Sequence, residues 1–415
     1  MSFFSLRWKP GFRRQVYGLP ITFSLVVLSG CGDNEYSADL RYPARTDPLV
    51  PRKMDTVPPH LDKPGDFPAI LSKLHFTDEE LNKKFEAEKK NFLDPTNLNT
   101  KTRDQIETRL EQLFGTPFKP KVDIQQLSED VRQSLNWDEN RRLLRLDENT
   151  LSQGSIAYRH HCLHCHGLPG DGRGPTSPWV NPHPRDFRLG IFKFTSTKGG
   201  NDRKPRREDL LRTLKEGIES TAMPSFALLP ENDLQAIISY VIHLSMRGDL
   251  ETNLIQRLLM ESDYSLKDAV EENIGAIVAS WINAANPQSL IVPEATNAVF
   301  PPGREQRQSV KNGFDLFRST KDAGCIGCHK DYGRQSDFFF DAWGTIGRAA
   351  DLTTGVYRGG RRPIDFYWRI HQGVNGSNMP SFGNLLKSEE IWDLVSFLQV
   401  LPHPKMREMF DIQFD

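Results

Sequence analysis

The strongest constraint on this chain is a pair of short cysteine motifs. Residues 162–166 read CLHCH and residues 325–329 read CIGCH. In each motif two cysteines stand three residues apart, and a histidine follows the second cysteine directly. Two thiols at this spacing can bond to the two vinyl groups of a porphyrin while the imidazole binds the iron, which is the attachment signature of c-type haem. The motifs use four of the five cysteines, so we expect two haems c, each with an iron atom.

The remaining cysteine, Cys31, follows a segment typical of an export signal. Residues 1–30 hold a basic stretch and then a short apolar run over residues 19–28. The apolar run is too short to span a bilayer comfortably, and it ends in Leu28-Ser29-Gly30-Cys31, which resembles the bacterial lipoprotein box. We therefore expect a lipoprotein signal peptide over residues 1–30 and a lipid on Cys31. The alternative is an uncleaved anchor with a stray cysteine.

These features predict an exported protein that a lipid anchors to a bacterial membrane, facing the periplasm. Removing the four positive charges of the signal peptide takes the formal net charge from −1 to −5. A chain with this charge is not expected to bind nucleic acid.

A length of 415 residues suits two or three domains. Residues 31–75 are polar and proline-rich and predict a flexible tether. Residues 76–149 show capping boxes at Thr77 to Glu80 and Thr102 to Gln105, which predict a helical extension packed on the first motif-bearing domain. A partly ordered spacer is the alternative. Residues 248–306 predict a connector, with a helix capped by Ser265 that docks one half of the chain against the other.

The two halves repeat one pattern. In residues 150–247, Gly154 and Tyr158 precede Cys162 at helical spacing, so a helix that begins near Thr150 delivers the first motif. In residues 307–405, Gly313 and Phe317 have the same spacing before the second motif. Later positions match at a constant offset of 156 residues. The sequence therefore predicts two copies of one folding unit, followed by a tail over residues 406–415.

A methionine follows each motif at a similar distance. Met223 lies 57 residues after His166 and Met379 lies 50 residues after His329, both in the sequence Met-Pro-Ser-Phe. A thioether is a soft iron ligand that raises the haem potential. A single methionine is more often a packing residue, but its repetition favours a ligand.

Each unit resembles a class I cytochrome c domain, and the pair resembles the tandem di-haem cytochromes c of bacterial respiratory chains. The resemblance implies an all-α fold with two such domains in tandem, joined by a helical connector and preceded by a helical N-terminal extension. It also implies that a helix with a glycine and an aromatic residue crosses a later helix with another, Tyr240 or Phe397.

The resemblance further implies a complete set of haem-binding residues. These are Cys162, Cys165, His166 and Met223 in the first unit and Cys325, Cys328, His329 and Met379 in the second. In that family a proline carbonyl commonly orients the proximal imidazole. The stretch from Asn181 to Phe187 offers candidates in the first unit, with Asn181 to Pro184 as the place to look first. The comparable Ala349 to Leu352 has no proline in the second unit, which places that contact in doubt.

Other histidines and arginines invite alternative interpretations. His160, His161 and His164 surround the first motif and suggest zinc, but a zinc site leaves the second motif and both methionines unexplained. His371 is an alternative to Met379, although Lys215 occupies its matching position in the first unit. Several arginines are candidates to pair with haem propionates or an acidic partner, and are otherwise surface residues: Arg185, Arg188, Arg206, Arg207, Arg361 and Arg362.

Two His/Met sites favour electron transfer over catalysis, because strong ligands on both sides of the iron exclude a substrate. We therefore expect a membrane-tethered respiratory carrier, or the cytochrome subunit of an oxidase or dehydrogenase complex, with redox proteins as donors and acceptors. We do not expect an enzyme. The alternative is a di-haem enzyme such as a cytochrome c peroxidase.

Overall fold

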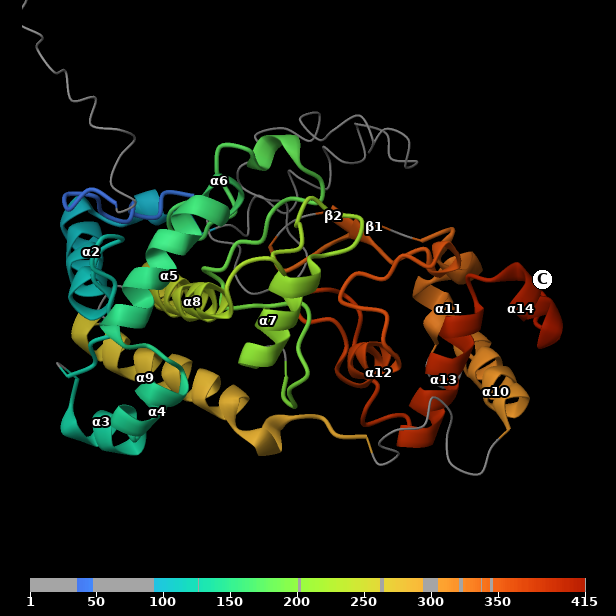
Figure 1. The fold of residues 1–415 in the computed structure, drawn as a ribbon. Coiled ribbons are helices and arrows are strands. Elements are labelled where there is room, and N and C mark those ends of the chain that lie inside the picture. The colour runs from blue at the N-terminus through green and yellow to red at the C-terminus, as the bar shows by residue number, and fades with distance from the viewer. Residues whose placement is uncertain are drawn as a thin grey trace, which may run out of the picture. The chain divides into compact units, whose positions relative to one another are not determined.

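The computed structural model describes residues 36–47, 93–125, 127–200, 203–261, 265–293, 305–320, 324–336, 338–343 and 346–414. The predicted signal peptide, Cys31 and the capping box at Thr77 lie outside these residues. The fold is mostly helical, as expected (Figure 1). None of the described helices is both long and apolar enough to cross a bilayer.

The described residues up to 293 form the following helices in chain order: η4 (Pro95–Asn97), α2 (Thr100–Phe114), α3 (Glu129–Ser134), α4 (Trp137–Leu143), α5 (Glu148–His161), α6 (Leu163–His166), η5 (Ser177–Trp179), α7 (Arg207–Glu216), α8 (Glu231–Met260), α9 (Leu266–Ala285) and η6 (Pro287–Ser289). Those labelled η are single 3₁₀ turns. Helices α2, α5, α8 and α9 contribute to one hydrophobic core.

The later described residues form the following elements: α10 (Gln306–Arg318), α11 (Cys325–Cys328), η7 (Lys330–Gly333), β1 (Phe338–Phe340), β2 (Ile346–Arg348), η8 (Leu352–Thr354), α12 (Pro363–Gln372), α13 (Ser388–Val400) and α14 (Pro404–Met409). Helices α10, α12 and α13 contribute to a second hydrophobic core. The strands pair antiparallel, with Phe339 opposite Gly347. This short hairpin is a departure from an all-α chain. It holds the turn at Asp341 to Trp343.

Each half is built on one helix crossing, and the two crossings are alike. A Cβ atom on Gly154 of α5 would lie 2.1 Å from the Ala236 carbonyl oxygen of α8. The ring centroids of Tyr158 and Tyr240 are 5.3 Å apart beside this contact. Only glycine permits so close an approach of two backbones.

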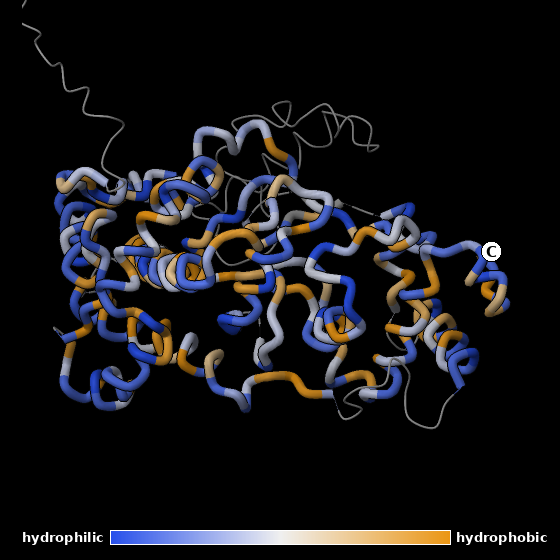
Figure 2. The backbone as a smooth tube through the Cα atoms, viewed as in Figure 1, coloured by the Kyte–Doolittle hydropathy of each residue, from blue (hydrophilic) through white to orange (hydrophobic). Residues whose placement is uncertain are grey.

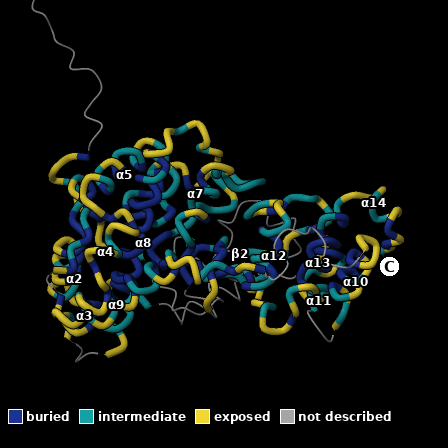
Figure 3. Tube along the Cα trace, turned by 60° about the horizontal axis from the view of Figure 1, so that its bottom comes forward, coloured by how far each residue is buried: buried dark blue, intermediate teal, exposed yellow. Residues whose placement is uncertain are grey.

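The second crossing repeats this geometry. A Cβ atom on Gly313 of α10 would lie 2.0 Å from the Asp393 carbonyl oxygen of α13. The rings of Phe317 and Phe397 lie 5.5 Å apart. The predicted pairing of glycine and aromatic residues is therefore present in both halves, and α8 and α13 are the most buried helices of their cores (Figure 3).

Two helices begin earlier than their capping boxes predict. The Asp147 side chain accepts the Thr150 backbone N–H at 2.9 Å, so α5 starts at Glu148. The Asn99 side chain accepts the Thr102 N–H at 2.8 Å, so α2 starts at Thr100. In both cases a better N-cap residue stands three positions before the threonine.

Helix α8 continues past the predicted end of the first unit at residue 247. Gly248 lies inside this helix, where the Arg188 backbone packs against it. A Cβ atom added to Gly248 would lie 2.4 Å from the Arg188 Cα atom, so the position requires glycine. The connector helix α9 is capped by Ser265 as predicted. Its buried face packs in the core of α8, however, so the expectation that it docks the two halves is wrong. Apolar residues recur along α8 and α9 (Figure 2).

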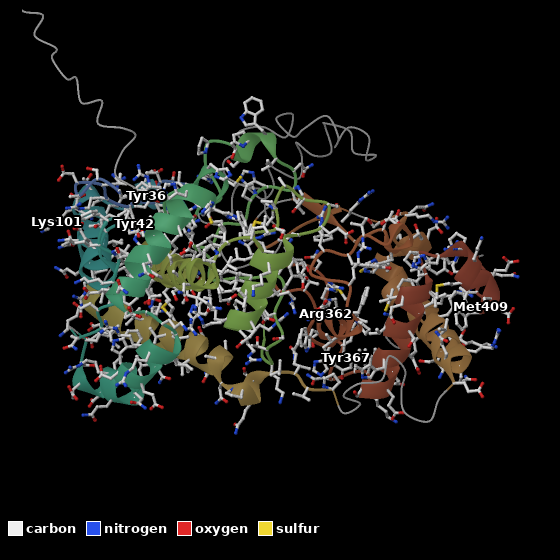
Figure 4. The ribbon with its side chains drawn as sticks, in the orientation of Figure 1. Tyr36, Tyr42, Lys101, Arg362, Tyr367 and Met409 are labelled. Atoms are coloured by element: carbon white, nitrogen blue, oxygen red, sulfur yellow. The ribbon has the colours of Figure 1, made fainter. Side chains whose placement is uncertain are left out.

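Residues 36–47, which we name the strap, are packed on the first half and are not part of a flexible tether. Tyr36, Tyr42 and Arg45 are buried. The hydroxyls of Tyr42 and Tyr240 lie 2.8 Å apart, and the Arg45 backbone N–H donates to Glu251 of α8 at 3.1 Å. Figure 4 labels both strap tyrosines, near α2 and α5. The tether prediction is therefore wrong for these residues.

Candidate haem-binding cavity

The first CxxCH motif is delivered by the end of α5. Cys162 closes this helix and starts the short helix α6, which ends at His166. The Tyr158 hydroxyl donates to the Gly167 carbonyl at 2.8 Å, and the Gly172 N–H donates to the His166 carbonyl at 2.9 Å. These bonds fold the chain back around the motif and fix the direction of its side chains.

The His166 ring is held on two sides. Its Nδ1 atom lies 3.0 Å from the Arg185 carbonyl oxygen, and its ring stacks on Phe187 with centroids 4.6 Å apart. A carbonyl oxygen can only accept, so Nδ1 carries the proton and Nε2 keeps a free lone pair. Burial lowers the pKa of His166 to about 4, which favours the same neutral imidazole.

The carbonyl that orients His166 belongs to Arg185. Arg185 lies within the candidate stretch from Asn181 to Phe187 but one residue beyond Pro184, the end of its preferred part. The acceptor is therefore in the predicted loop, but it is not a proline carbonyl. Which backbone carbonyl faces a ring depends on the path of the loop, and a side-chain pattern does not specify it.

The second motif has the same arrangement without a proline. His329 follows α11, and its Nδ1 atom lies 3.1 Å from the Ala350 carbonyl oxygen. Gly333 lets this carbonyl approach, because a Cβ atom there would lie 2.0 Å from it. Burial lowers the pKa of His329. The contact placed in doubt by the missing proline is therefore present.

Two matching loops hold the methionines. The Met223 N–H donates to the Thr221 hydroxyl at 3.1 Å, and the Met223 carbonyl accepts the Ile218 N–H at 3.1 Å. The Met379 N–H donates to the Ser377 hydroxyl at 3.2 Å, and the Met379 carbonyl accepts the Val374 N–H at 3.2 Å. The sequence repeat is thus a repeat of loop structure.

All predicted haem-binding residues line one cavity of about 1850 Å³. They are Cys162, Cys165, His166, Met223, Cys325, Cys328, His329 and Met379. Typical single-ligand pockets measure about 300–1,000 Å³, so this cavity is large enough for more than one large ligand. The structure thus brings the two donor sets to a single space.

Basic side chains also line this cavity. They are Arg173, Arg185, Lys193, Arg348, Arg358 and Arg369. Burial lowers the pKa of Lys193 to about 8 and that of Arg369 to about 10. Buried cations of this kind favour a carboxylate partner. Only Arg185 was predicted; the others lack a motif in the sequence.

The other predicted arginines pair with protein groups outside the cavity wall. Arg188 donates to Asp186 and Asp47, Arg206 lies 3.5 Å from Glu208, Arg207 donates to Gln235, Arg361 pairs with Glu219, and Arg362 pairs with Asp365. For these five residues the structure gives a role within the protein.

The surplus histidines are placed differently from one another. His371 is absent from the cavity wall; its ring stacks on Tyr367 at 5.6 Å. Lys215, at the matching position, pairs with Glu231. His160, His161 and His164 do line the cavity. Among the described residues, however, no three His, Cys, Asp or Glu side chains group as a metal site.

The donors fit a covalently bound haem c at each site. The described cysteines are free thiols, two of them at each histidine. Each histidine keeps Nε2 for a metal, and a methionine reaches the same cavity. The described wall is largely apolar away from the basic residues, with Phe187, Leu214 and Ile370 among its members. A porphyrin needs a wall of this kind.

Comparison with known proteins gives one family match. The family described as cytochrome c oxidase, cbb3-type, subunit III, matches residues 149–241 and 308–398. None of the curated proteins compared matches the chain. Among solved structures, a chain of a reducing HAO-like protein complex of Kuenenia stuttgartiensis is 25% identical, with a TM-score of 0.41, over 60% of this chain and 95% of that one. The two matched regions contain both CxxCH motifs and both methionines, so the match supports two cytochrome c domain regions in tandem.

Proposed function

We propose that this protein transfers electrons between redox proteins through two covalently bound haems c with His/Met ligation. The observation that carries this proposal is the duplicated donor set, in which each histidine and its methionine line the same cavity. Bound there, each haem would supply one-electron redox chemistry. His166 and Met223 would hold one iron, and His329 and Met379 the other.

The chain's own residues support a carrier over an enzyme. With His166 and Met223 as ligands of one iron and His329 and Met379 as ligands of the other, neither iron would keep a position open to a substrate. A di-haem peroxidase instead needs one iron that opens, and Met223 and Met379 are both built into hydrogen-bonded loops. The carbonyls of Arg185 and Ala350 keep the two imidazoles in one orientation. We therefore propose that the protein is not an enzyme.

The single cavity favours a relay through the molecule. Because both donor sets line it, no separate wall of protein divides the described sites into two cavities. Transfer between two cofactors in one cavity needs no partner between them. We propose that a donor protein delivers electrons at one site and an acceptor collects them at the other.

A redox titration of the purified protein with haem counting tests this function. We expect two haems per chain, two reversible high-potential transitions, and little binding of carbon monoxide by the reduced protein. Methionine ligation supports the high potentials. One haem per chain would contradict the proposal, and rapid carbon monoxide binding with peroxide turnover would favour the peroxidase.

Membership of a larger complex is a second form of the same proposal. The matching family is described as a subunit of a cytochrome c oxidase. We propose that an oxidase or dehydrogenase complex is among the partners of this chain. Helices α2, α3 and α4 lie outside both matched regions, so they are one part of the described chain that is available for an assembly role.

We also propose export to the periplasm and lipid anchoring at Cys31. The export features of residues 1–30 support this. Tyr36 of the strap lies five positions after Cys31, and five residue steps span at most roughly 18 Å. Since Tyr36 is buried on the first domain, the lipid would keep that domain close to the membrane.

Replacing the cysteine tests the anchor. Cys31→Ala is expected to move the protein from the membrane fraction to the soluble fraction while both haems are retained. Mass spectrometry of the mature N-terminus should find the lipid in the wild type. A variant that stays in the membrane fraction would contradict lipid anchoring.

A further inference from the structure

Trp343 is a residue of the second domain that contacts the first domain beside its proximal histidine. It lies in the turn between β1 and β2, and it is buried. Its indole Nε1–H donates to the Asp186 carbonyl at 2.9 Å. The Arg185 guanidinium lies over the same ring, 3.7 Å from its centroid. Trp343 therefore contacts two consecutive residues of the loop that orients His166.

The second domain holds this indole firmly. A Cβ atom on Gly376 would lie 2.5 Å from the Trp343 ring, and the Gly376 carbonyl accepts the Ala342 N–H at 2.9 Å. Gly376 stands three residues before Met379. Trp343 thus lies between the loop of the distal ligand of one site and the loop that supports the proximal ligand of the other.

A buried carboxylate reinforces the contact. Asp341 accepts a hydrogen bond from Lys193 of the first domain at 2.9 Å and lies 3.6 Å from Arg185. It also accepts the Trp343 backbone N–H at 3.1 Å. Asp341 therefore both stabilises the turn that contains Trp343 and pairs with the first-domain cations Lys193 and Arg185.

The consequence concerns the bond that orients His166. Its Nδ1–H donates to the Arg185 carbonyl, and the next carbonyl along the chain is the one that accepts from Trp343. A fixed acceptor strengthens the hydrogen bond at Nδ1, which makes the imidazole a stronger donor to a metal and lowers the potential of that metal.

Resting on the proposed function, we propose that Trp343 is a positioning residue by which the second domain sets the redox potential of the first haem. It acts through the 185–186 backbone and does not itself line the cavity. His329 depends on Ala350 of its own domain. The influence therefore runs from the second domain to the first site.

Trp343→Phe is the variant that isolates the hydrogen bond, because an aromatic ring under Arg185 is kept and the indole N–H is lost. Trp368→Phe is its matched control. The Trp368 Nε1–H donates to the Ile291 carbonyl at 3.0 Å, and the Arg212 guanidinium lies 5.3 Å from its ring. The control therefore also loses an indole N–H to carbonyl hydrogen bond, but its acceptor, the Ile291 carbonyl, is not in a loop that orients His166 or His329.

The measurement is a redox titration of the two full-length variants and the wild type, each with both haems counted. Met223→His identifies which transition belongs to the first site. We expect Trp343→Phe to raise the potential of the first haem and leave the second unchanged, and Trp368→Phe to move neither. We also expect the His166 Nδ1 proton, followed by NMR, to exchange roughly two- to tenfold faster in Trp343→Phe, as for the loss of one hydrogen bond.

The proposal would be overturned if Trp343→Phe left the potential of the first haem unchanged or shifted that of the second haem instead. It would also be overturned if Trp368→Phe produced the same shift. Each of these results would leave the electron-transfer function intact. A wild type that lacks two titrating haems would overturn the function itself. A second measurement needs no variant. In the wild type the His166 Nδ1 proton is expected to exchange more slowly than that of His329, and the reverse order would also overturn the positioning role.

Discussion

Single glycines decide whether the two helix crossings form. Gly154→Ala would place a methyl group 2.1 Å from the Ala236 carbonyl oxygen, so α5 and α8 would have to separate. We expect the free energy of unfolding to fall by about 1–3 kcal/mol, the usual cost of overpacking a core. Thermal or urea unfolding of the purified protein measures this.

Gly275 of α9 is the matched control, because its added Cβ atom would lie 3.7 Å from the nearest atom, a methyl carbon of Val131. Alanine is favoured over glycine within a helix by about 0.8–1.0 kcal/mol, so Gly275→Ala is expected to leave the stability unchanged or raise it. Equal losses in the two variants would contradict the close approach at Gly154.

At the residue scale, the side chains that meet in the cavity could be predicted, and the exact groups that support them could not. Cysteine, histidine and methionine carry their chemistry in the side chain, so spacing and repetition were enough to single out Cys162, His166 and Met223 as haem-binding candidates, and all three line the cavity. The acceptor for His166 is a backbone carbonyl, which any residue can supply. Trp343 acts across 157 positions of sequence through Asp186, and no local pattern indicates such a contact.

At the scale of elements, helix positions followed from the hydrophobic pattern but their ends did not. The interior of α9 was predicted from its apolar face and its Ser265 cap. The first unit was predicted to end at residue 247, whereas helix α8 continues to Met260. Glycine stands at position 248 because Arg188 approaches it too closely for a side chain, a tertiary contact that outweighs the low helix propensity of glycine.

The strap shows that sequence-based prediction can also miss the tertiary contacts of a whole segment. Its composition predicts a tether, since prolines and polar residues dominate residues 31–75. It packs because Tyr42 and Arg45 find partners on α8 some 200 residues later. Asp47 adds a buried pair with Arg188, and the two cations Arg45 and Arg188 hold the pKa of Asp47 well below its usual range.

At the scale of the whole molecule, the tandem arrangement was predictable and the shared cavity was not. Two motifs and two methionines predict two sites, and the family match at residues 149–241 and 308–398 agrees with that division. Whether the sites face a common space depends on contacts between domains. Arg203 donates to the Gly373 carbonyl at 3.1 Å, and Lys193 donates to Asp341. Both contacts join residues far apart in sequence.

The central claim is that two independent His/Met sites lie in one chain, and titration of the single Met→His variants tests it most directly. Because methionine ligation raises a haem potential relative to histidine, Met223→His should lower the potential of one haem and Met379→His that of the other. In each variant the second transition should stay close to its wild-type value. Equal movement of both transitions in either variant, or no movement in one, would contradict the account.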